Sequence, residues 1–393
     1  MFFIKMKKKN SNYRRWIMHA LSFILAISVA LPAYIQSSYL KQYISLEVLS
    51  LFFVASNAIT VLMIGWFPKI IRHLGNYFTA KIVMVLYGIS LLGLVAANNA
   101  TLAIMFLLFF GITSTLLWIN IDILLEEASS DSKTGRIRTL HLTFTNLGWI
   151  IAPALSAYFV KIGGYSWPFL ISAFLVIPLF FILISQRINL KSKKKYTKEN
   201  LVKSFKKLWA NKNLRGVFIA ATLLNLFFSC AVIYIPIYLN TNLGISWKSL
   251  GVIFSFMLLP FILFEIPAGF LADKYFGEKE IMLIGLSIIF LSLLLFFTIT
   301  TTAPWIWAIA LFVSRIGAAL LESMRDTYFF KNVNAKEIGY INIFRMTGPL
   351  GYLIGSATAA CFLIFLPINY LFLIFAALLA PGFYYIGIIQ DTK

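Results

Sequence analysis

Charged residues are scarce in this sequence. Only 12% of its 393 residues are Asp, Glu, Lys or Arg, whereas about 25% is usual for a soluble domain. Carboxylates are the scarcer sign, with 14 Asp and Glu residues against 34 Lys and Arg residues. Hydrophobic residues make up 60% of the chain. This composition excludes a water-soluble globular fold and favours a protein whose surface faces lipid.

Cysteine and histidine are also rare, with two and three residues. Cys230 and Cys361 both fall inside long apolar runs and resemble small buried hydrophobic residues rather than a disulfide framework. His19, His73 and His141 lie in three separate segments, without an HExxH pattern, a zinc-ligand spacing or a phosphate-binding glycine loop. We therefore expect no metal, no cofactor and no enzymatic activity.

Long apolar runs are what the chain has in abundance. Each is about 20 residues long, the length of helix that crosses roughly 30 Å of hydrocarbon. Because a helix satisfies its own backbone groups in lipid, and because each run is continuously apolar, the runs predict helices rather than barrel strands. We expect an all-α membrane protein with twelve transmembrane helices, at residues 16–36, 46–68, 78–97, 102–124, 138–160, 166–186, 215–239, 248–271, 280–299, 304–326, 340–364 and 367–388.

The net charge of +20 is distributed unevenly between the loops. With a cytoplasmic N-terminus, the outside loops contain only Lys41, Lys161 and Lys248, and the other loop lysines and arginines lie inside. Lys and Arg concentrate in cytoplasmic loops of membrane proteins. The pattern predicts a multi-pass protein of the cell (plasma or inner) membrane with both termini in the cytoplasm, and it explains the basicity without a nucleic-acid partner.

One long polar stretch interrupts the apolar runs, between residues 187 and 215. It predicts an N-terminal six-helix bundle at 1–186, a basic cytoplasmic linker at 187–214 and a C-terminal six-helix bundle at 215–393. Within the linker, Leu201, Phe205, Leu208 and Trp209 share one helical face, with lysines elsewhere. An amphipathic helix on the membrane surface and a disordered basic linker are both compatible with this stretch.

The two halves repeat each other. LPAYIQ at 31–36 returns as IPIYLN at 235–240, so Pro32 and Pro236 are 204 residues apart, as are Gly65 and Gly269. NLGWIIAP, from 146, matches PLGYLIGS, from 349, with an offset of 203. A constant offset predicts two pseudo-symmetric bundles of six helices, and because six is even the repeat is parallel. Pro32 and Pro236 are expected to bend equivalent helices.

The loop GFLADKYFGEK at 269–279 resembles the signature loop of the major facilitator superfamily of transporters. Gly269, Asp273 and Gly277 stand at the signature's characteristic positions, with Gly277 one place later than usual. The resemblance implies the fold of that superfamily, transport by alternating access, and a substrate cavity between the halves that is lined by the first, fourth, seventh and tenth helices. In the first half, Lys69 stands at the aspartate position.

The resemblance also implies a latch at the cytoplasmic side, in which signature loops pair with acids at neighbouring helix ends. We expect Arg72 to pair with Asp122, and Lys274 or Lys279 to pair with Glu322 or Asp326. A solvated carboxylate at a helix end is the alternative for each acid. The latch residues are Gly65, Lys69, Arg72, Asp122, Gly269, Asp273, Lys274, Gly277, Lys279, Glu322 and Asp326.

Two ionisable residues lie deeper in their spans, where a charge costs roughly 2.5–3.5 kcal/mol. Glu265, one turn before Gly269, is either a proton site or a structural brace. Arg315, near the middle of the tenth span, binds either an anionic substrate or a neighbouring helix, because a guanidinium does not lose its proton.

Polar and aromatic side chains at cavity depth are candidate substrate contacts. Each could instead bond or pack between helices. These candidates are Tyr34, Gln36, Asn57, Asn146, Trp149, Asn225, Tyr238, Arg315 and Tyr352. Gly148, Ala152, Gly351 and Gly355 are spaced four apart in two of the spans and are expected to permit close helix contact.

The sequence thus predicts a monomeric secondary transporter in the lipid bilayer that binds a small-molecule substrate and protons. Proton-coupled efflux of small amphipathic compounds, as an antiporter, is the main hypothesis. Uptake of an anionic nutrient or a sugar-like solute is the alternative within the class. A non-transporting membrane receptor or assembly factor on the same scaffold is the alternative outside it.

Overall fold

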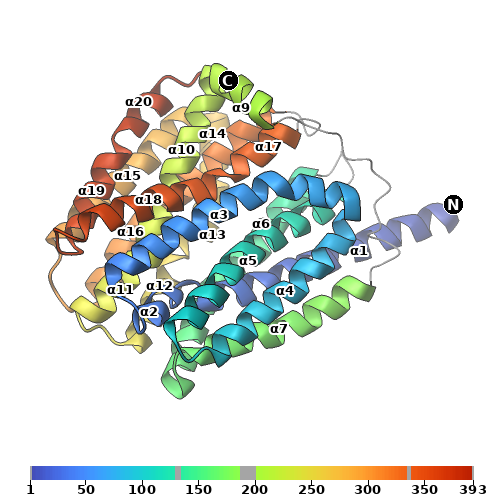
Figure 1. Ribbon diagram of the computed structural model, residues 1–393. Coiled ribbons are helices and arrows are strands. Elements are labelled where there is room, and N and C mark those ends of the chain that lie inside the picture. Colours follow the sequence, from blue (N-terminus) through green and yellow to red (C-terminus); the bar gives the residue numbers. More distant parts are fainter. Residues whose placement is uncertain (1, 129–133, 186–200, 334–337, 392–393) are drawn as a thin grey trace. The chain divides into compact units, whose positions relative to one another are not determined.

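Helices form every regular element in the part of the chain that the structure describes (Figure 1). The structure is a computed structural model that describes residues 2–128, 134–185, 201–333 and 338–391. Contacts divide the chain into two compact units, Met1–Tyr43 with Met63–Tyr196, and Ile44–Leu62 with Thr197–Lys393. Residues 44–62 were expected in the N-terminal bundle, and the boundaries 1–186, 187–214 and 215–393 remain a proposal.

The first unit is built around α1. This helix packs against α5, α6 and α7, and α4 packs against α5 and α7. The helices between residues 2 and 185 are α1 (Phe2–Ala33), α2 (Gln36–Lys41), α3 (Leu46–Leu74), α4 (Asn76–Ala96), α5 (Ala100–Ala128), α6 (Thr134–Gly163) and α7 (Ser166–Ser185).

The second unit repeats this arrangement around α10. That helix packs against α16, α18 and α20, and α15 packs against α16, α19 and α20. Its further elements are α9 (Leu201–Ala210), α10 (Lys212–Ser229), η2 (Cys230–Tyr234), α11 (Ile235–Ile237), η3 (Tyr238–Asn242), α12 (Trp247–Met257), α13 (Pro260–Leu263), α14 (Glu265–Lys274), α15 (Glu278–Thr298), α16 (Pro304–Asn332), α17 (Ile338–Arg345), α18 (Thr347–Phe362), α19 (Tyr370–Leu379) and α20 (Pro381–Gly387). The shared pattern of helix neighbours confirms the predicted pair of pseudo-symmetric bundles.

Eleven stretches of the described residues are long and apolar enough to cross a membrane. The remaining predicted span, 340–364, is divided into α17 and α18 at Met346, so neither piece is long enough alone. Pro349 explains the break, because proline donates no hydrogen bond and its ring clashes with the carbonyl four residues earlier, here that of Arg345. The structure is therefore consistent with twelve spans, one of them interrupted.

Prolines interrupt other helices of the second unit as well. The eighth span breaks before Pro260 and the twelfth before Pro381. At both breaks, the carbonyl four residues before the proline accepts a hydrogen bond from the residue three positions later instead. These bonds run from Leu259 N to Phe256 O and from Ala380 N to Ala377 O, both at 3.2 Å. In the first unit, Pro68, Pro153 and Pro178 remain inside helices that continue past them.

The paired prolines of the two repeats are accommodated differently. Beyond Pro32, α1 ends at Ala33 and a turn precedes α2, with Ile35 N donating to Pro32 O at 3.0 Å. Pro236 lies between two π-helical segments, η2 and η3, so the seventh span continues as a wider helix. Both prolines disturb their helices, but only Pro32 is followed by a change to a separate helix.

The amphipathic stretch of the predicted linker is helical. It forms α9, which packs against α10 and α17 in the second unit. This supports the amphipathic-helix interpretation for residues 201–210, while residues 187–200 of the linker lie outside the described residues.

Small residues allow the central helix of each unit to approach its neighbour. A Cβ at Gly148 of α6 would lie 2.7 Å from Cβ of Ala26 in α1. A Cβ at Gly351 of α18 would lie 2.5 Å from Cβ of Asn225 and 2.6 Å from the backbone of α10. These distances confirm that the two glycines permit close helix contact, as their equivalent positions in the repeat predict.

Replacing Gly351 with Ala should lower the free energy of unfolding by about 1–3 kcal/mol, because the added methyl forces α10 and α18 apart. Thermal or denaturant unfolding of the purified protein in detergent measures the change. Gly387→Ala is the matched control, since a Cβ there meets nothing within 4 Å. Equal stabilities of the two variants would contradict the close-contact explanation.

Candidate functional site

Two of the predicted cavity residues meet in the first unit. Tyr34 occupies the turn after Pro32 and is 4% exposed. Its ring stands edge-on to that of Trp149 in α6, with 6.5 Å between the centroids and an interplanar angle of 88°. Trp149 also packs against the small core cluster formed by Ala30, Leu31 and Ala152. The break after Pro32 thus places an aromatic pair between α1 and α6.

Two amides lie near this pair along the chain. Gln36 is the first residue of α2, two positions after Tyr34, and Asn146 precedes Trp149 by three positions in α6; both are partly exposed. Amide side chains offer both donors and acceptors. The first unit therefore presents rings and hydrogen-bonding groups on neighbouring helices.

The remaining neutral candidates are held differently. Asn57, in the part of α3 that belongs to the second unit, donates to Phe53 O of its own helix at 2.7 Å. Tyr238 is 6% exposed and packs edge-on against Trp307 at 5.8 Å and Phe372 at 5.3 Å between centroids. Its surroundings correspond to an aromatic packing contact, the alternative role foreseen for it. Tyr352 is partly exposed on α18.

Arg315 is buried on α16, with 1% of its surface exposed. Its guanidinium carbon lies 5.0 Å from the ring centroid of Phe227 and 5.4 Å from that of Phe228, both on α10. Cation–π attraction to desolvated rings is worth about 2 kcal/mol. The geometry therefore ties α16 to α10.

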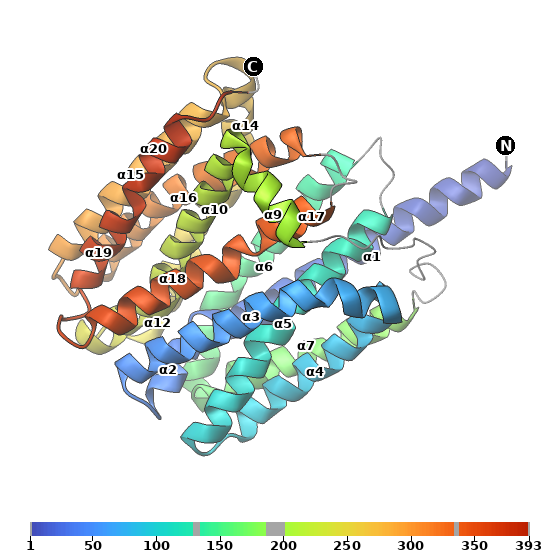
Figure 2. The ribbon, with the colours of Figure 1, turned by 45° about the horizontal axis from the view of Figure 1, so that its top comes forward.

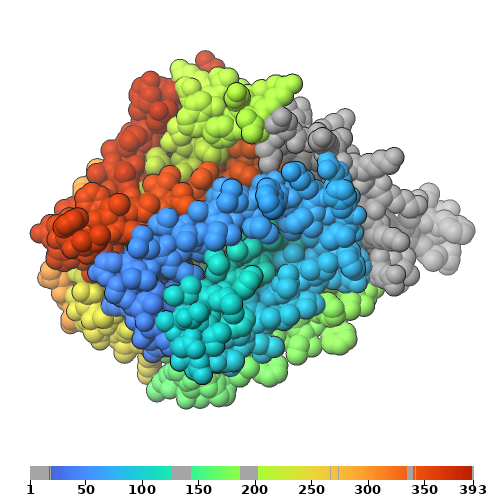
Figure 3. All heavy atoms as spheres, in the orientation of Figure 1, coloured from blue at the N-terminus to red at the C-terminus, as the bar shows by residue number. Residues whose placement is uncertain are grey.

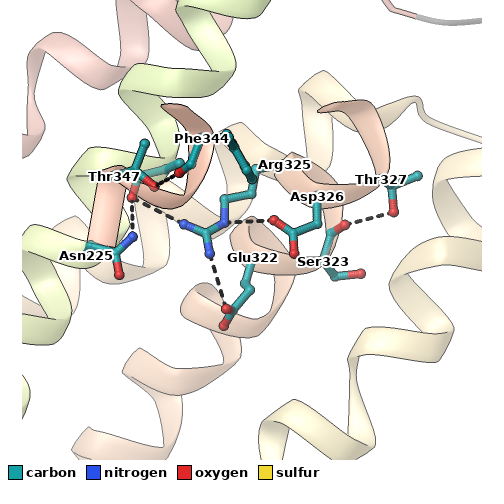
Figure 4. A network of polar contacts seen from close by, with 9 residues as sticks. Asn225, Glu322, Ser323, Arg325, Asp326, Thr327, Phe344 and Thr347 are labelled. Carbon is teal, nitrogen blue, oxygen red and sulfur yellow. Dashed lines mark hydrogen bonds and ion pairs between the residues drawn. The ribbon is translucent and has the colours of Figure 1, made fainter. Parts of the chain in front are cut away.

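Glu322 and Asp326, two predicted latch acids, share one guanidinium on their own helix. Nη2 of Arg325 lies 3.2 Å from Oε1 of Glu322, and Nε lies 3.3 Å from Oδ1 of Asp326. Figure 4 shows Arg325 between the two carboxylates. Because Arg325 is only 8% exposed, these contacts are partly shielded from water.

The same arginine connects three helices of the second unit. Its Nη1 donates to Ala221 O of α10 at 3.2 Å, and Asn225 donates to the same carbonyl at 2.8 Å (Figure 4). Its guanidinium carbon lies 5.8 Å from the ring centroid of Phe344 in α17, which stacks on Phe329 of α16 at 4.0 Å. Arg325 thus holds α10, α16 and α17 at one point.

Lys279, a predicted partner of those acids, pairs elsewhere. Its Nζ lies 3.3 Å from Oε1 of Glu280 and 3.4 Å from Oδ2 of Asp391, and its backbone N–H donates to Oδ1 of Asp391 at 3.0 Å. Asp391 thereby caps the N-terminus of α15. The residue that precedes this helix is Gly277. Gly277 has φ of 121°, and a Cβ there would lie 2.8 Å from Oδ1 of Asp391.

Further polar contacts surround this C-terminal clasp, which we define as Asp391 with Gly277 and Lys279. Lys331 Nζ lies 2.7 Å from Oε1 of Glu278, and Gln390 N donates to Oδ1 of Asn213 at 3.1 Å. A pocket of about 440 Å³ is lined by Asn213, Tyr328, Lys331, Asn332, Gln390 and Asp391. None of the predicted cavity residues lines it, so it does not correspond to the expected substrate site.

The latch residues of the first unit lie toward the ends of α3 and α5. Gly65, Lys69 and Arg72 lie on the last turns of α3, with Lys69 and Arg72 exposed, and Asp122 is partly exposed on α5. Pairing of Arg72 with Asp122 stays a prediction.

In the second unit, Gly269 and Asp273 belong to α14, and the side chain of Asp273 lies outside the described residues. The ammonium of Lys274 lies 5.4 Å from the ring centroid of Phe270 and 5.2 Å from that of Tyr275. The positive charge in the last turn of α14, that of Lys274, therefore lies close to two aromatic rings.

Glu265 lies in the first turn of α14, immediately after the break at Phe264. Its backbone carbonyl accepts a hydrogen bond from Ser323 of α16 at 3.4 Å. An acidic side chain in the first turn of a helix is favourable. This position is compatible with the bracing role, and titration of the carboxylate stays a hypothesis.

These features define a multi-pass helical membrane protein made of two related bundles. The chain belongs to the Major Facilitator Superfamily, whose profile matches residues 16–259 and 217–389. The match confirms the family inferred from the signature loop, and with it the predicted class, a membrane transporter.

Individual relatives agree with this class. Sugar efflux transporter A of Escherichia coli (strain K12) is 28% identical over 160 residues, which cover 39% of this chain and 38% of that protein. The match therefore spans well under half of that relative's length.

Solved structures of two transporters share the fold. The nucleoside transporter NupG superposes with a TM-score of 0.73 and 17% identity, covering 96% of this chain and 100% of that one. An autoinhibited peptide transporter of the POT family gives a TM-score of 0.79 at 11% identity, covering 97% and 98%. At these identities the likeness concerns the fold alone.

Sequence reasoning missed two residues of this site. Arg325 follows Glu322 by three positions and precedes Asp326, a spacing that could have identified an ion pair on one helix face. Asp391 gave no such signal, because its partner Lys279 lies 112 residues away.

Replacing Arg325 with Gln should lower the free energy of unfolding by about 1–3 kcal/mol, because charged hydrogen bonds are lost and two carboxylates are left close together. Adding Glu322→Gln should restore part of this loss, which a double-mutant cycle in detergent-solubilised protein measures. Arg72→Gln, on an exposed arginine, serves as the control and should change stability by less than about 0.5 kcal/mol. Strict additivity of the two substitutions would contradict the pair.

Replacing Asp391 with Ala should destabilise the protein by about 0.5–2 kcal/mol, the usual effect of losing a helix cap. Asp391→Asn keeps an acceptor for Lys279 N–H and should lose less. Unfolding midpoints of purified protein test the order. Gln390→Ala is the control, because the contacts described for Gln390 use its backbone atoms; an equal loss in all three variants would rule out the cap.

Proposed function

We propose that this protein exports a small, uncharged amphipathic solute by alternating access, in exchange for protons. Membership of the Major Facilitator Superfamily supports transport. The partial similarity to a protein named as a sugar efflux transporter supports export as the direction and a sugar-like solute as the cargo.

The aromatic pair of the first unit, Tyr34 and Trp149, is the main support for an amphipathic solute. Trp149 is partly exposed and offers ring surface, the buried Tyr34 supports its ring edge-on, and Gln36 and Asn146 offer amide donors and acceptors along the same two helical segments. A site that binds small molecules combines apolar and aromatic walls with a few polar groups that fix orientation. A solute with an apolar face and hydroxyl groups matches that combination.

The placement of Arg315 favours an uncharged solute over an anionic nutrient. Its guanidinium lies against Phe227 and Phe228 within the second unit, so the protein itself surrounds the charge. Uptake of an anion would need this side chain to exchange those contacts for the substrate. We therefore rank anion uptake second, and a non-transporting receptor third.

We also propose a membrane topology and a coupling ion for this transporter. The distribution of Lys and Arg supports a plasma or inner membrane location with both termini in the cytoplasm. Glu265 is the proposed proton site, because it is an acidic residue within a membrane-spanning stretch, where ionisable groups commonly serve proton transfer. We further propose that the monomer is the transporting unit and has no enzymatic activity.

Transport by purified protein in proteoliposomes tests the proposal. With radiolabelled sugars and glycosides, we expect counterflow, and a pH gradient should drive net solute movement against the proton flow. Trp149→Ala should weaken the apparent affinity by up to about tenfold, since an aromatic contact is worth about 0.5–1.5 kcal/mol. Trp66→Ala is the matched control, because Trp66 is 66% exposed.

Each part of the proposal can fail separately. If the transport rate of the wild-type protein does not respond to the pH gradient, proton coupling is ruled out. In Glu265→Gln protein, we expect the gradient to have no effect on transport and counterflow to persist. Transport of an organic anion that Arg315→Gln abolishes would favour the uptake alternative. Absence of counterflow for every solute class, in protein with a normal unfolding transition, would favour the receptor alternative.

A further inference from the structure

Helix α9 has an apolar edge that the described part of the protein leaves uncovered. Leu208 is fully buried, on the side where α9 packs against α10 and α17. Val202, Phe205 and Trp209 are 66%, 40% and 41% exposed. At about 100° per residue, these four side chains form one continuous arc of roughly 120°. Only part of the apolar arc of α9 is therefore used for packing.

The exposed rings are held in a fixed arrangement. Phe205 and Trp209 stack with 5.6 Å between their centroids, and both stand edge-on to Phe218 of α10, at 5.9 and 6.3 Å. Arg215 Nη1 donates to Trp209 O at 3.3 Å, which ties the end of α9 to α10. The contacts with Phe218 and with each other thus hold Phe205 and Trp209 in place while both rings remain partly exposed.

Three lysines occupy the rest of the helix circumference. Lys203, Lys206 and Lys207 are exposed, and the rotation of the helix places Lys206 directly beside the apolar edge. No acidic residue occurs between Leu201 and Ala210. The surface of α9 therefore joins an apolar edge to a face on which every charged side chain is a lysine.

The position of α9 sets the level at which this surface lies. Asn211 separates α9 from α10 and caps α10 by accepting from Asn213 N at 3.0 Å and Leu214 N at 3.1 Å. The membrane-spanning stretch begins at the next residue, Lys212. Figure 2 shows α9 turning away from the axis of α10, and Figure 3 shows its yellow-green atoms at the surface. The helix thus lies at the end of a candidate span, where a membrane protein is expected to meet the lipid headgroups.

We propose that α9 is a docking surface for anionic phospholipids of the membrane in which the protein is embedded. Val202, Phe205 and Trp209 enter the boundary between headgroups and acyl chains. Lys203, Lys206 and Lys207 bind the headgroup phosphates. A helix with apolar and aromatic residues on one face and lysines on the other binds membranes in this manner, and the uniform positive charge selects anionic over zwitterionic lipids.

The docked lipid would act on a defined part of the second unit. Because α9 packs against α17, a headgroup held by α9 restrains the helix that carries Phe344. Phe344 lies under Arg325, the residue that joins α10, α16 and α17. The lipid site therefore lies on a helix that packs directly against α10 and α17, two of the helices that Arg325 joins.

Titration of purified full-length protein in detergent with dioctanoyl phosphatidylglycerol tests this inference, with the thermal unfolding midpoint as the readout. The lipid should raise the midpoint of the wild type. In the triple variant Lys203→Gln, Lys206→Gln, Lys207→Gln, the apparent Kd should increase by about 100-fold, since each lysine near an anionic surface contributes about fivefold. Salt at about 1 M should remove most of the difference through screening.

The control triple variant Lys41→Gln, Lys161→Gln, Lys248→Gln removes the same charge elsewhere and should keep the wild-type Kd. Dioctanoyl phosphatidylcholine should give no difference between the proteins. An unchanged Kd in the α9 variant, which is also the result expected of a surface that binds a protein, would overturn the inference. So would an equal loss in the control variant. The readout needs no transport, so it is independent of the proposed function.

Discussion

A backbone N–H or C=O group within a lipid bilayer has no water to bond, and the rest of this structure follows from that constraint. It accounts for helices in every described span and for the way the prolines are accommodated. In the second unit, helices end before Pro260, Pro349 and Pro381 and begin again within a few residues. At two of these breaks, Phe256 O and Ala377 O accept hydrogen bonds from the residue three positions later, which replace the bonds that proline removes.

Burial of charge imposes a second condition on the same helices. Arg325 contacts two carboxylates and a backbone carbonyl, and Arg315 lies against two aromatic rings. Both arginines are on α16 and both reach α10. A pair of helices joined by two buried cations is expected to move together, because separating them would break the hydrogen bond of Arg325 to Ala221 O and the contacts of Arg315 with Phe227 and Phe228 in a medium of low dielectric constant. This makes α10 and α16 a rigid element within the second unit of the proposed transporter.

The two units share one pattern of helix neighbours but differ in how regular their helices are. Pro68, Pro153 and Pro178 are tolerated inside continuous helices of the first unit, whereas the second unit contains repeated breaks. Breaks create helix ends within the spans, and Glu265 lies at one of them. The second unit is therefore better suited to hold charged groups at depth, and the first unit, with Tyr34 and Trp149, is better suited to hold a ring-binding surface.

The class of fold and the repeat could be predicted from the amino-acid sequence, and the structure is consistent with the twelve spans that the sequence predicts. Each of these depends on local hydrophobicity or on a constant offset, such as that between Gly148 and Gly351, which both lie at close helix contacts. The partner of each polar or aromatic side chain followed only from the packing of the helices. Glu322 and Asp326 contact Arg325, Lys279 contacts Asp391, and Tyr238 packs among rings. A side chain on a helix has many neighbours within reach, and only the packing of distant segments selects which of them it meets.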